Sequence, residues 1–205
     1  MRKCVHQRIL GWISSGVVAG VFLGTQCSSW SRARRGPLGS SWGPVRSNDF
    51  ILGIPGISVA DTLKVRIGNQ QAKYTSQIIQ TCIHNHIPCM LENPQTSMLW
   101  AYPALAQLCN LDVGQEHVLH QCCYGTRWRK ATRVQAWLCG HVLNLDRKCQ
   151  GRKGICSITN KPHIVLSGSS KVHGVLWTSL AQKYPGALGR RLATILVNGH
   201  LAQIG

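Results

Sequence analysis

The chain contains few acidic residues. Six of its 205 residues are Asp or Glu, against 23 Lys or Arg, so its formal net charge is +17. A surplus of this size does not determine a fold, but it predicts attraction to polyanions, of which nucleic acid is the commonest. The plain alternative is a reading frame with a basic skew and no selected partner.

The chain also lacks a long apolar run. No segment approaches the roughly 18 continuous apolar residues of a membrane-spanning helix, so we expect no association with a membrane. The start of the chain imitates a secretory signal, since Arg2 and Lys3 precede an apolar stretch at 13–23. Polar residues interrupt that stretch and no small-x-small cleavage site follows. We therefore expect an intracellular protein, with the nucleus favoured, and keep a secreted protein as the alternative.

Cysteine, by contrast, is abundant, with ten residues in the chain. A secreted disulfide-rich protein is one explanation, and it predicts paired cysteines. Buried free thiols, which behave as small hydrophobic side chains, are the other. Apolar residues make up 44% of the chain, and its length suffices for a domain with a substantial core.

Apolar periodicity predicts alternating helices and strands. We expect helices over 1–16, 69–86, 97–108, 176–183 and 187–201, and strands over 17–23, 89–91, 116–123, 134–138 and 164–166. A segment rich in Gly, Pro and Ser at 36–60 predicts a long loop. This order is typical of an α/β fold with a mostly parallel sheet and flanking helices.

A cysteine follows the first predicted strand. That strand ends at Gly24-Thr25, and Cys27 lies in the loop behind it. The carboxyl ends of strands are where open α/β sheets place their binding and reactive groups. Three arginines follow, which would hold an anion, most plausibly phosphate: Arg32, Arg34 and Arg35.

Three segments resemble, in order, motifs of the DNA cytosine-5 methyltransferases. The stretch around Cys27 is similar to motif IV, although Gln26 stands where the family has proline. The sequence Glu-Asn-Pro at 92–94 is similar to Glu-Asn-Val of motif VI, and 124–133 resembles motif VIII in outline. The resemblance covers residues 17 to about 138. It is nearest to divergent methylase-like domains of mobile elements, and it implies a partial Rossmann-like methyltransferase sheet.

The resemblance implies covalent catalysis on a flipped cytosine. Cys27 would be the nucleophile, with a pKa lowered by the neighbouring arginines. Glu92 would be the acid that protonates ring N3, which requires a raised pKa. Residues that shape the loop or contact the base and its phosphates would be Asn93, Pro94, Arg129, Lys130, Thr132 and Arg133. The plain alternatives are a buried thiol, a capping carboxylate and a solvated basic hairpin.

The resemblance also implies S-adenosylmethionine, but the family's Gly-rich cofactor loop has no counterpart before Val17. We therefore expect a truncated and inactive form, or a missing amino-terminal half or second chain that completes it. The alternative function is a non-enzymatic, basic nucleic-acid-binding protein derived from a mobile element. Either form would have nucleic acid, most plausibly DNA, as its partner.

Cysteine and histidine recur near the carboxyl end. Zinc prefers four thiolate or imidazole ligands, and five candidates lie within 25 residues: Cys139, His141, Cys149, Cys156 and His163. Their spacing matches no standard zinc finger, so scattered buried thiols are the alternative. We divide the chain into a partial methyltransferase-like region at 1–138, and a small Cys/His-containing segment with carboxyl-terminal helices at 139–205 that packs on the same domain.

Overall fold

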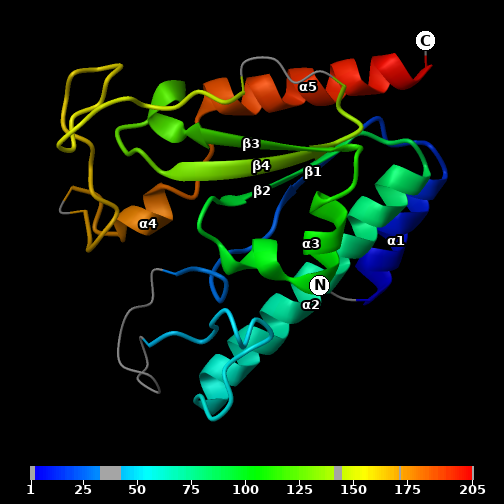
Figure 1. The fold of residues 1–205 in the computed structure, drawn as a ribbon, viewed down its shortest axis with the longest axis horizontal. Helices are drawn as coiled ribbons and strands as arrows, with labels where there is room; N and C mark the ends of the chain where they lie inside the picture. Colours follow the sequence, from blue (N-terminus) through cyan, green and yellow to red (C-terminus); the bar gives the residue numbers. More distant parts are fainter. Residues whose placement is uncertain (1–2, 33–42, 141–144, 171, 205) are drawn as a thin grey trace.

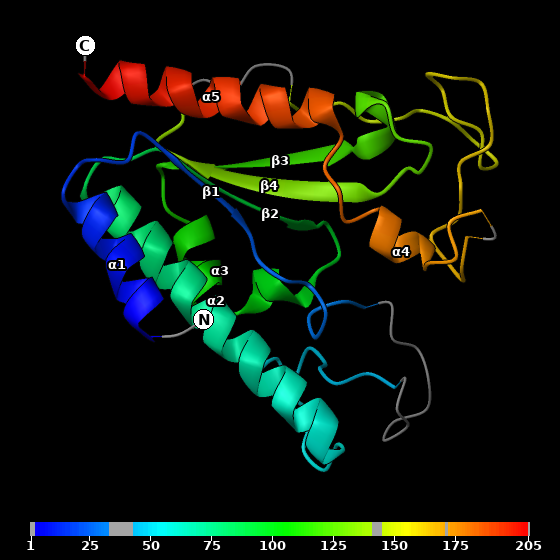
Figure 2. The same ribbon diagram turned by 180° about the vertical axis from the view of Figure 1, so that it is seen from behind.

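The protein is an α/β structure with helices on both faces of one sheet. The computed structural model describes residues 3–32, 43–140, 145–170 and 172–204. Helices α1–α3 cover one face of the sheet and α5 covers the other (Figures 1 and 2). In chain order the elements are α1 (Lys3–Ser14), β1 (Val21–Gly24), α2 (Val59–His84), β2 (Cys89–Pro94), η1 (Met98–Ala101), α3 (Pro103–Cys109), β3 (Gly114–His120), η2 (Gln121–Tyr124), β4 (Ala131–Trp137), α4 (Trp177–Leu180) and α5 (Gly186–Ile204).

The four described strands form a mixed sheet in the order β1-β2-β4-β3. Strands β1 and β2 are parallel, with Gly24 opposite Glu92, whereas β4 is antiparallel to both β2 and β3. The prediction of a mostly parallel sheet is therefore wrong for β4, which is antiparallel to both of its neighbours. The connection from β3 to β4 is too short for a crossover, so the chain turns back and β4 inserts beside β2.

Two apolar cores follow from the alternation of side chains along the strands. In β2, Cys89 and Leu91 face the core beneath α1–α3, while Met90 faces the core beneath α5. In β4, Trp137 belongs to the first core and Val134 to the second. The second core also includes buried residues beyond position 138, so the carboxyl-terminal segment packs on the same sheet.

Several element boundaries differ from the sequence prediction. Helix α2 begins ten residues earlier than expected, because the Ser58 hydroxyl accepts a hydrogen bond from Asp61 N and caps it. The helix expected over 97–108 is two pieces, with Pro103 starting α3 at a position that needs no backbone donor. Residues 164–166 form no strand, although Ile164 N donates to Arg127 O at 2.9 Å.

A buried arginine fixes the loop that follows β1 against α2. Arg46 is 3% exposed, and its guanidinium lies 3.4 Å from the ring centre of Trp30. It donates to Ser29 O, Ile51 O and Val65 O, as well as to two side chains. Burial lowers its pKa to about 10. The predicted loop is thus anchored by hydrogen bonds where it is described. None of the described helices is both long and apolar enough to span a bilayer.

Candidate functional site

The parallel pair β1–β2 brings the predicted nucleophile and acid to one edge of the sheet. Cys27 lies three residues after the end of β1, and Glu92 lies in β2 opposite the last residue of β1. Asn93 Nδ2 donates to Thr25 O at 2.6 Å, which ties the two strand ends together. Thr25 in turn shares a 2.7 Å hydroxyl hydrogen bond with Thr75 of α2. The site therefore rests on regular elements on both sides.

Glu92 is a buried carboxyl group in which one oxygen accepts a hydrogen bond and the other accepts none from the described residues. Its Oε2 accepts a 2.6 Å hydrogen bond from the Tyr184 hydroxyl. Its Oε1 is buried and has no hydrogen-bond partner in the described residues. Burial raises the pKa of Glu92, against the opposing effects of the Tyr184 hydrogen bond and the Lys130 charge. The direction of the shift is the one that the predicted role requires, and the role of Glu92 as an acid stays a prediction.

Cys27 is half-buried, and its pKa departs from the sequence prediction. Burial raises the pKa of the thiol; the Lys130 charge opposes that shift and the Glu92 charge adds to it. The net direction is upward, so the expected lowering of this pKa by the neighbouring arginines is wrong, and Lys130 is the cation that acts on the thiol. Of the predicted arginines, Arg32 donates instead to Asn48 Oδ1 at 2.8 Å. Arg34 and Arg35 lie outside the described residues.

Two members of this site enter from the chain beyond β3. Lys130 immediately precedes β4, and its Nζ donates to Ala181 O at 3.0 Å. Tyr184 lies between α4 and α5 and was not predicted from the sequence. Burial first, then the charge and hydrogen bond of Glu92, raise the pKa of Tyr184. Its only sequence signal is the Tyr-Pro-Gly that precedes a helix, which by itself indicates a turn.

The remaining predicted contact residues make bonds within the protein. Thr132 is fully buried in β4, within reach of Gln121 Nε2 at 3.3 Å. Arg133 pairs with Glu116 at 3.0 Å and lies over the Trp100 ring at 4.2 Å. These bonds give both residues a structural role, and their contact with a base stays a prediction.

Two further predicted contact residues, Arg129 and Pro94, also take part in hydrogen bonds within the protein. Arg129 donates to His120 Nδ1 at 3.2 Å and to Cys149 O at 3.3 Å, which turns it toward the Cys/His segment. Pro94 O accepts a 3.0 Å hydrogen bond from Trp100 Nε1, which holds the loop after β2. Pro94 thus shapes this loop, as expected, through its backbone.

The predicted Cys/His cluster forms in the structure, but with a different set of residues. Cys149, Cys156 and His163 converge as expected, and the fourth member is Cys122 of η2. Cys139 lies apart, with its thiol against Trp137 O at 3.3 Å and Cys89 O at 3.6 Å, and burial raises its pKa to about 12. His141 lies outside the described residues.

The ligand atoms of this cluster lie within 4.8 Å of one another. Cys149 Sγ is 4.0 Å from Cys156 Sγ and 3.8 Å from His163 Nε2. Burial acts to raise the pKa of the Cys149 thiol, but hydrogen bonds from the side chain and backbone of Ser157 outweigh it and lower that pKa to about 6. A Cys/His cluster of this kind can hold a metal ion, so zinc fits the donor set.

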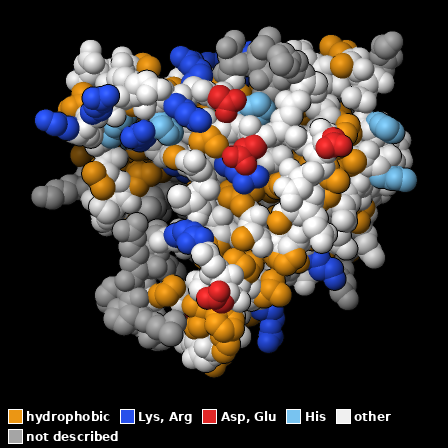
Figure 3. Space-filling model, viewed as in Figure 1, with side chains coloured by type: hydrophobic (Ala, Val, Ile, Leu, Met, Phe, Trp, Pro, Cys, Tyr) orange, Lys and Arg blue, Asp and Glu red, His pale blue; other side chains and the backbone are white. Residues whose placement is uncertain are grey.

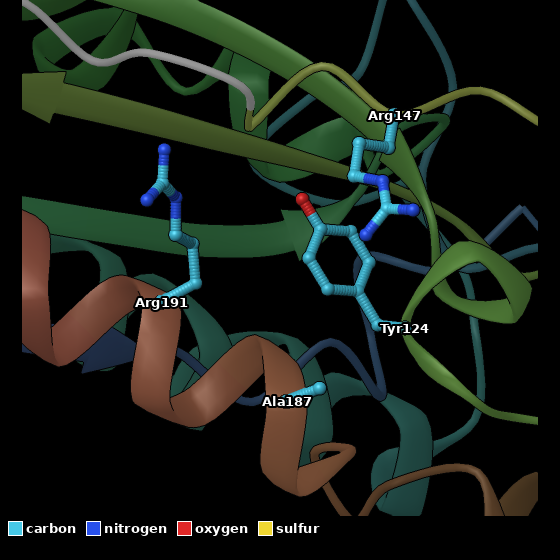
Figure 4. A pocket seen from close by; sticks show the side chains of 4 residues that line it. All are labelled: Tyr124, Arg147, Ala187 and Arg191. Atoms are coloured by element: carbon cyan, nitrogen blue, oxygen red, sulfur yellow. The ribbon is translucent and has the colours of Figure 1, made fainter.

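A small pocket with two arginines lies between the loop after β4 and α5. Tyr124, Arg147, Ala187 and Arg191 line it, and Figure 4 shows the Arg147 guanidinium beside the Tyr124 ring and the Arg191 side chain across from it. That hydroxyl donates to Leu145 O at 2.8 Å. None of the predicted catalytic residues lines this pocket.

Exposed basic residues gather on the segment between β4 and α4. Arg147, Lys148, Arg152, Lys153 and Lys161 are all exposed. Figure 3 shows several Lys and Arg side chains at the left of the molecule, where Figure 1 places this segment. Positive charge in such a cluster suits contact with a phosphate backbone.

Comparison of the chain with protein-family models, with curated proteins and with solved structures finds no match.

Proposed function

We propose that the chain acts on DNA as a methyltransferase-like protein that adds Cys27 covalently to a flipped cytosine. One observation carries the proposal. Glu92, a buried carboxyl group with a raised pKa and an unpartnered Oε1, lies at the strand end beside Cys27. Glu92 pairs with Gly24, the last residue of β1, and Cys27 follows three residues later, so both groups belong to the same end of this strand pair. An acid beside a thiol at the carboxyl ends of parallel strands suits attack on an electrophilic ring.

In the proposed step, the Cys27 thiol first loses its proton to water, which the positive charge of Lys130 favours. The thiolate forms a bond to C6 as the C5–C6 π pair moves through the ring toward N3. N3 takes the proton of the Glu92 carboxyl group, which leaves Glu92 ionised and hydrogen-bonded to Tyr184. The product is an enamine whose C5 is nucleophilic.

The described residues do not fit S-adenosylmethionine, so no methyl-transfer step is derived. No described strand lies beyond β1 at its edge of the sheet, where the family resemblance would put the cofactor-binding part. Of the acidic residues of the chain, only Glu92 belongs to β1 or β2. A methyl donor would have to be held by an amino-terminal half or a second chain.

Exchange of the cytosine C5 hydrogen tests the addition without any methyl donor, because the enamine takes up a proton at C5 from water. We expect deuterium to enter C5 of duplex DNA in heavy water, and Cys27→Ser to abolish the exchange. The control is Cys109→Ser, a half-buried thiol whose charge interacts with Arg133 and Glu116 instead. Exchange that survives in Cys27→Ser would contradict the assignment of the nucleophile.

The raised pKa of Cys27 favours a second function, that of a non-enzymatic nucleic-acid-binding protein. A protonated thiol is a poor nucleophile, whereas the exposed basic segment serves phosphate contact whatever the state of Cys27. Binding of this kind weakens steeply as salt rises. Retention of DNA that depends on salt, with no C5 exchange under any condition, would favour this second function.

A further inference from the structure

We infer that the chain binds one Zn²⁺ ion through Cys122, Cys149, Cys156 and His163, as a structural site. The inference is independent of the proposed cytosine chemistry. Three thiols and one imidazole is a standard set for a closed zinc site. The four come from η2 and from the segment after β4, and three of them are buried. No spacing rule predicts this set, because Cys122 precedes the next ligand by 27 positions.

The distances suit a tetrahedron. With Zn–S bonds of about 2.3 Å, two thiolates on one ion lie about 3.8 Å apart. The 4.0 Å between the sulfurs of Cys149 and Cys156, and the 3.8 Å to His163 Nε2, are within a few tenths of an ångström of that value. A disulfide needs about 2.05 Å, and it would leave a third thiol and an imidazole without a role.

Hydrogen bonds around Cys149 supply the outer shell that metal thiolates use. Ser157 donates to Cys149 Sγ from its backbone N at 3.3 Å and from its hydroxyl at 3.4 Å. The backbone N of Cys149 donates to His120 Nδ1 at 2.9 Å, and Arg129 holds its carbonyl oxygen. The position of Cys149 is therefore fixed by contacts from β3, from the β3–β4 connection and from its own loop.

The segment that carries Cys149, Cys156 and His163 has no regular secondary structure where it is described. Between Cys149 and His163 the structure describes no helix and no strand, only an isolated bridge from Ile155 to Pro162. Ile155 and Ile158 are exposed, so this loop does not bury an apolar core of its own. Segments of this size are usually held by a metal or by disulfides, and a zinc ion would cross-link the loop to η2.

Zinc content of tag-free protein, purified under reducing conditions, tests the site. We expect one zinc per chain by mass spectrometry, and Co²⁺ replacing it should give the visible bands of a tetrahedral thiolate complex. Cys156→Ser should lose most of the metal. Cys139→Ser is the matched control, since Cys139 is also buried but lies outside the cluster, and this variant should keep one zinc.

The Co²⁺ spectrum of the unaltered protein keeps the test valid if a variant fails to fold. Folded protein without zinc and without the cobalt bands would overturn the inference. A disulfide between Cys149 and Cys156 under reducing conditions would also overturn it. Loss of zinc in Cys139→Ser, with retention in Cys156→Ser, would overturn the ligand set.

Discussion

The Tyr184 hydroxyl donates a 2.6 Å hydrogen bond to Glu92 Oε2, across 92 positions of sequence. This bond links the segment before α5 to the carboxyl end of β2. It occupies one oxygen of a buried carboxyl group, and the other oxygen accepts no hydrogen bond from the part of the chain that the structure describes. A methyl group on Gly24 would come within 2.9 Å of the Tyr184 oxygen, so the small residue that ends β1 is what allows the contact.

Tyr184→Phe should shift the pH dependence of C5 exchange. The hydrogen bond from Tyr184 lowers the pKa of Glu92, so its removal should raise that pKa further and keep the acid protonated to higher pH. We expect the alkaline limb of the exchange rate to move upward, with a rate loss of about tenfold from poorer positioning. Tyr102→Phe, between η1 and α3, should leave the profile unchanged. An unshifted profile in Tyr184→Phe would show that the hydroxyl does not act on Glu92.

Glu92→Gln should separate catalysis from stability. Because burial raises the pKa of Glu92, its contribution to stability is full below the ordinary value of 4.5 and is lost as pH rises through the raised value. The amide carries no charge, so this variant should unfold at a higher temperature than the wild type at neutral pH and at a similar temperature near pH 4.

The same Glu92→Gln variant should lose C5 exchange by a factor of about 10² to 10⁴, since it removes the proton donor. Thermal unfolding at two pH values and the exchange assay measure the two effects separately. A variant that is less stable than the wild type at neutral pH would contradict the raised pKa.

Lys130→Met should slow the addition at neutral pH. The Lys130 charge lowers the pKa of both Cys27 and Glu92, so without it both limbs of the pH profile should move upward. Lys148→Met removes an exposed cation elsewhere and should weaken only the salt-dependent binding of DNA, with a salt slope smaller by about one. If the two substitutions had equal effects on C5 exchange and on DNA binding, the role of Lys130 would be limited to phosphate contact.

Gly68→Ala should destabilise the fold through the loop after β1. A Cβ at Gly68 would clash with Ser29 Oγ and would lie 2.8 Å from Arg46 Nη2, so the buried network must shift, at a cost of about 1–3 kcal/mol. Gly11→Ala in α1 meets nothing within 4 Å and should stabilise by up to about 1 kcal/mol. Urea unfolding measures both. A neutral Gly68→Ala would indicate that the loop does not pack closely on α2.

The sequence predicted the parts of the fold that rest on local periodicity. The existence of each main helix and of the four strands was readable, because apolar spacing and Pro or Gly boundaries are local properties. The direction of β4 was not, since it depends on a short return after η2. The early start of α2 was missed because the buried face of its first ten residues includes Asp61 and Gly68 beside Val65, which weakens the apolar periodicity there.

The candidate sites were predicted in part for the same reason. Cys27 and Glu92 could be paired because the sequence places both at the carboxyl ends of predicted strands, and β1 and β2 are neighbours in the sheet. Tyr184 was not found, since it reaches Glu92 from a distant part of the chain. Cys122 precedes the Cys/His segment in the sequence, but no spacing assigned it to the ligand set. The shift of the Cys27 pKa was predicted in the wrong direction. The prediction rested on the arginines that are near in sequence, whereas burial, which the sequence does not show, is the largest cause of the shift.

Covalent trapping on DNA detects the proposed bond between Cys27 and the base itself. A duplex that carries a pyrimidinone in place of cytosine lacks the 4-amino group and is more electrophilic at C6, so a thiolate adduct should persist through denaturation without a methyl donor. We expect such an adduct with the wild-type chain and with Cys109→Ser, and none with Cys27→Ser. Absence of any adduct from a folded, DNA-bound chain, or an adduct that survives in Cys27→Ser, would contradict the account.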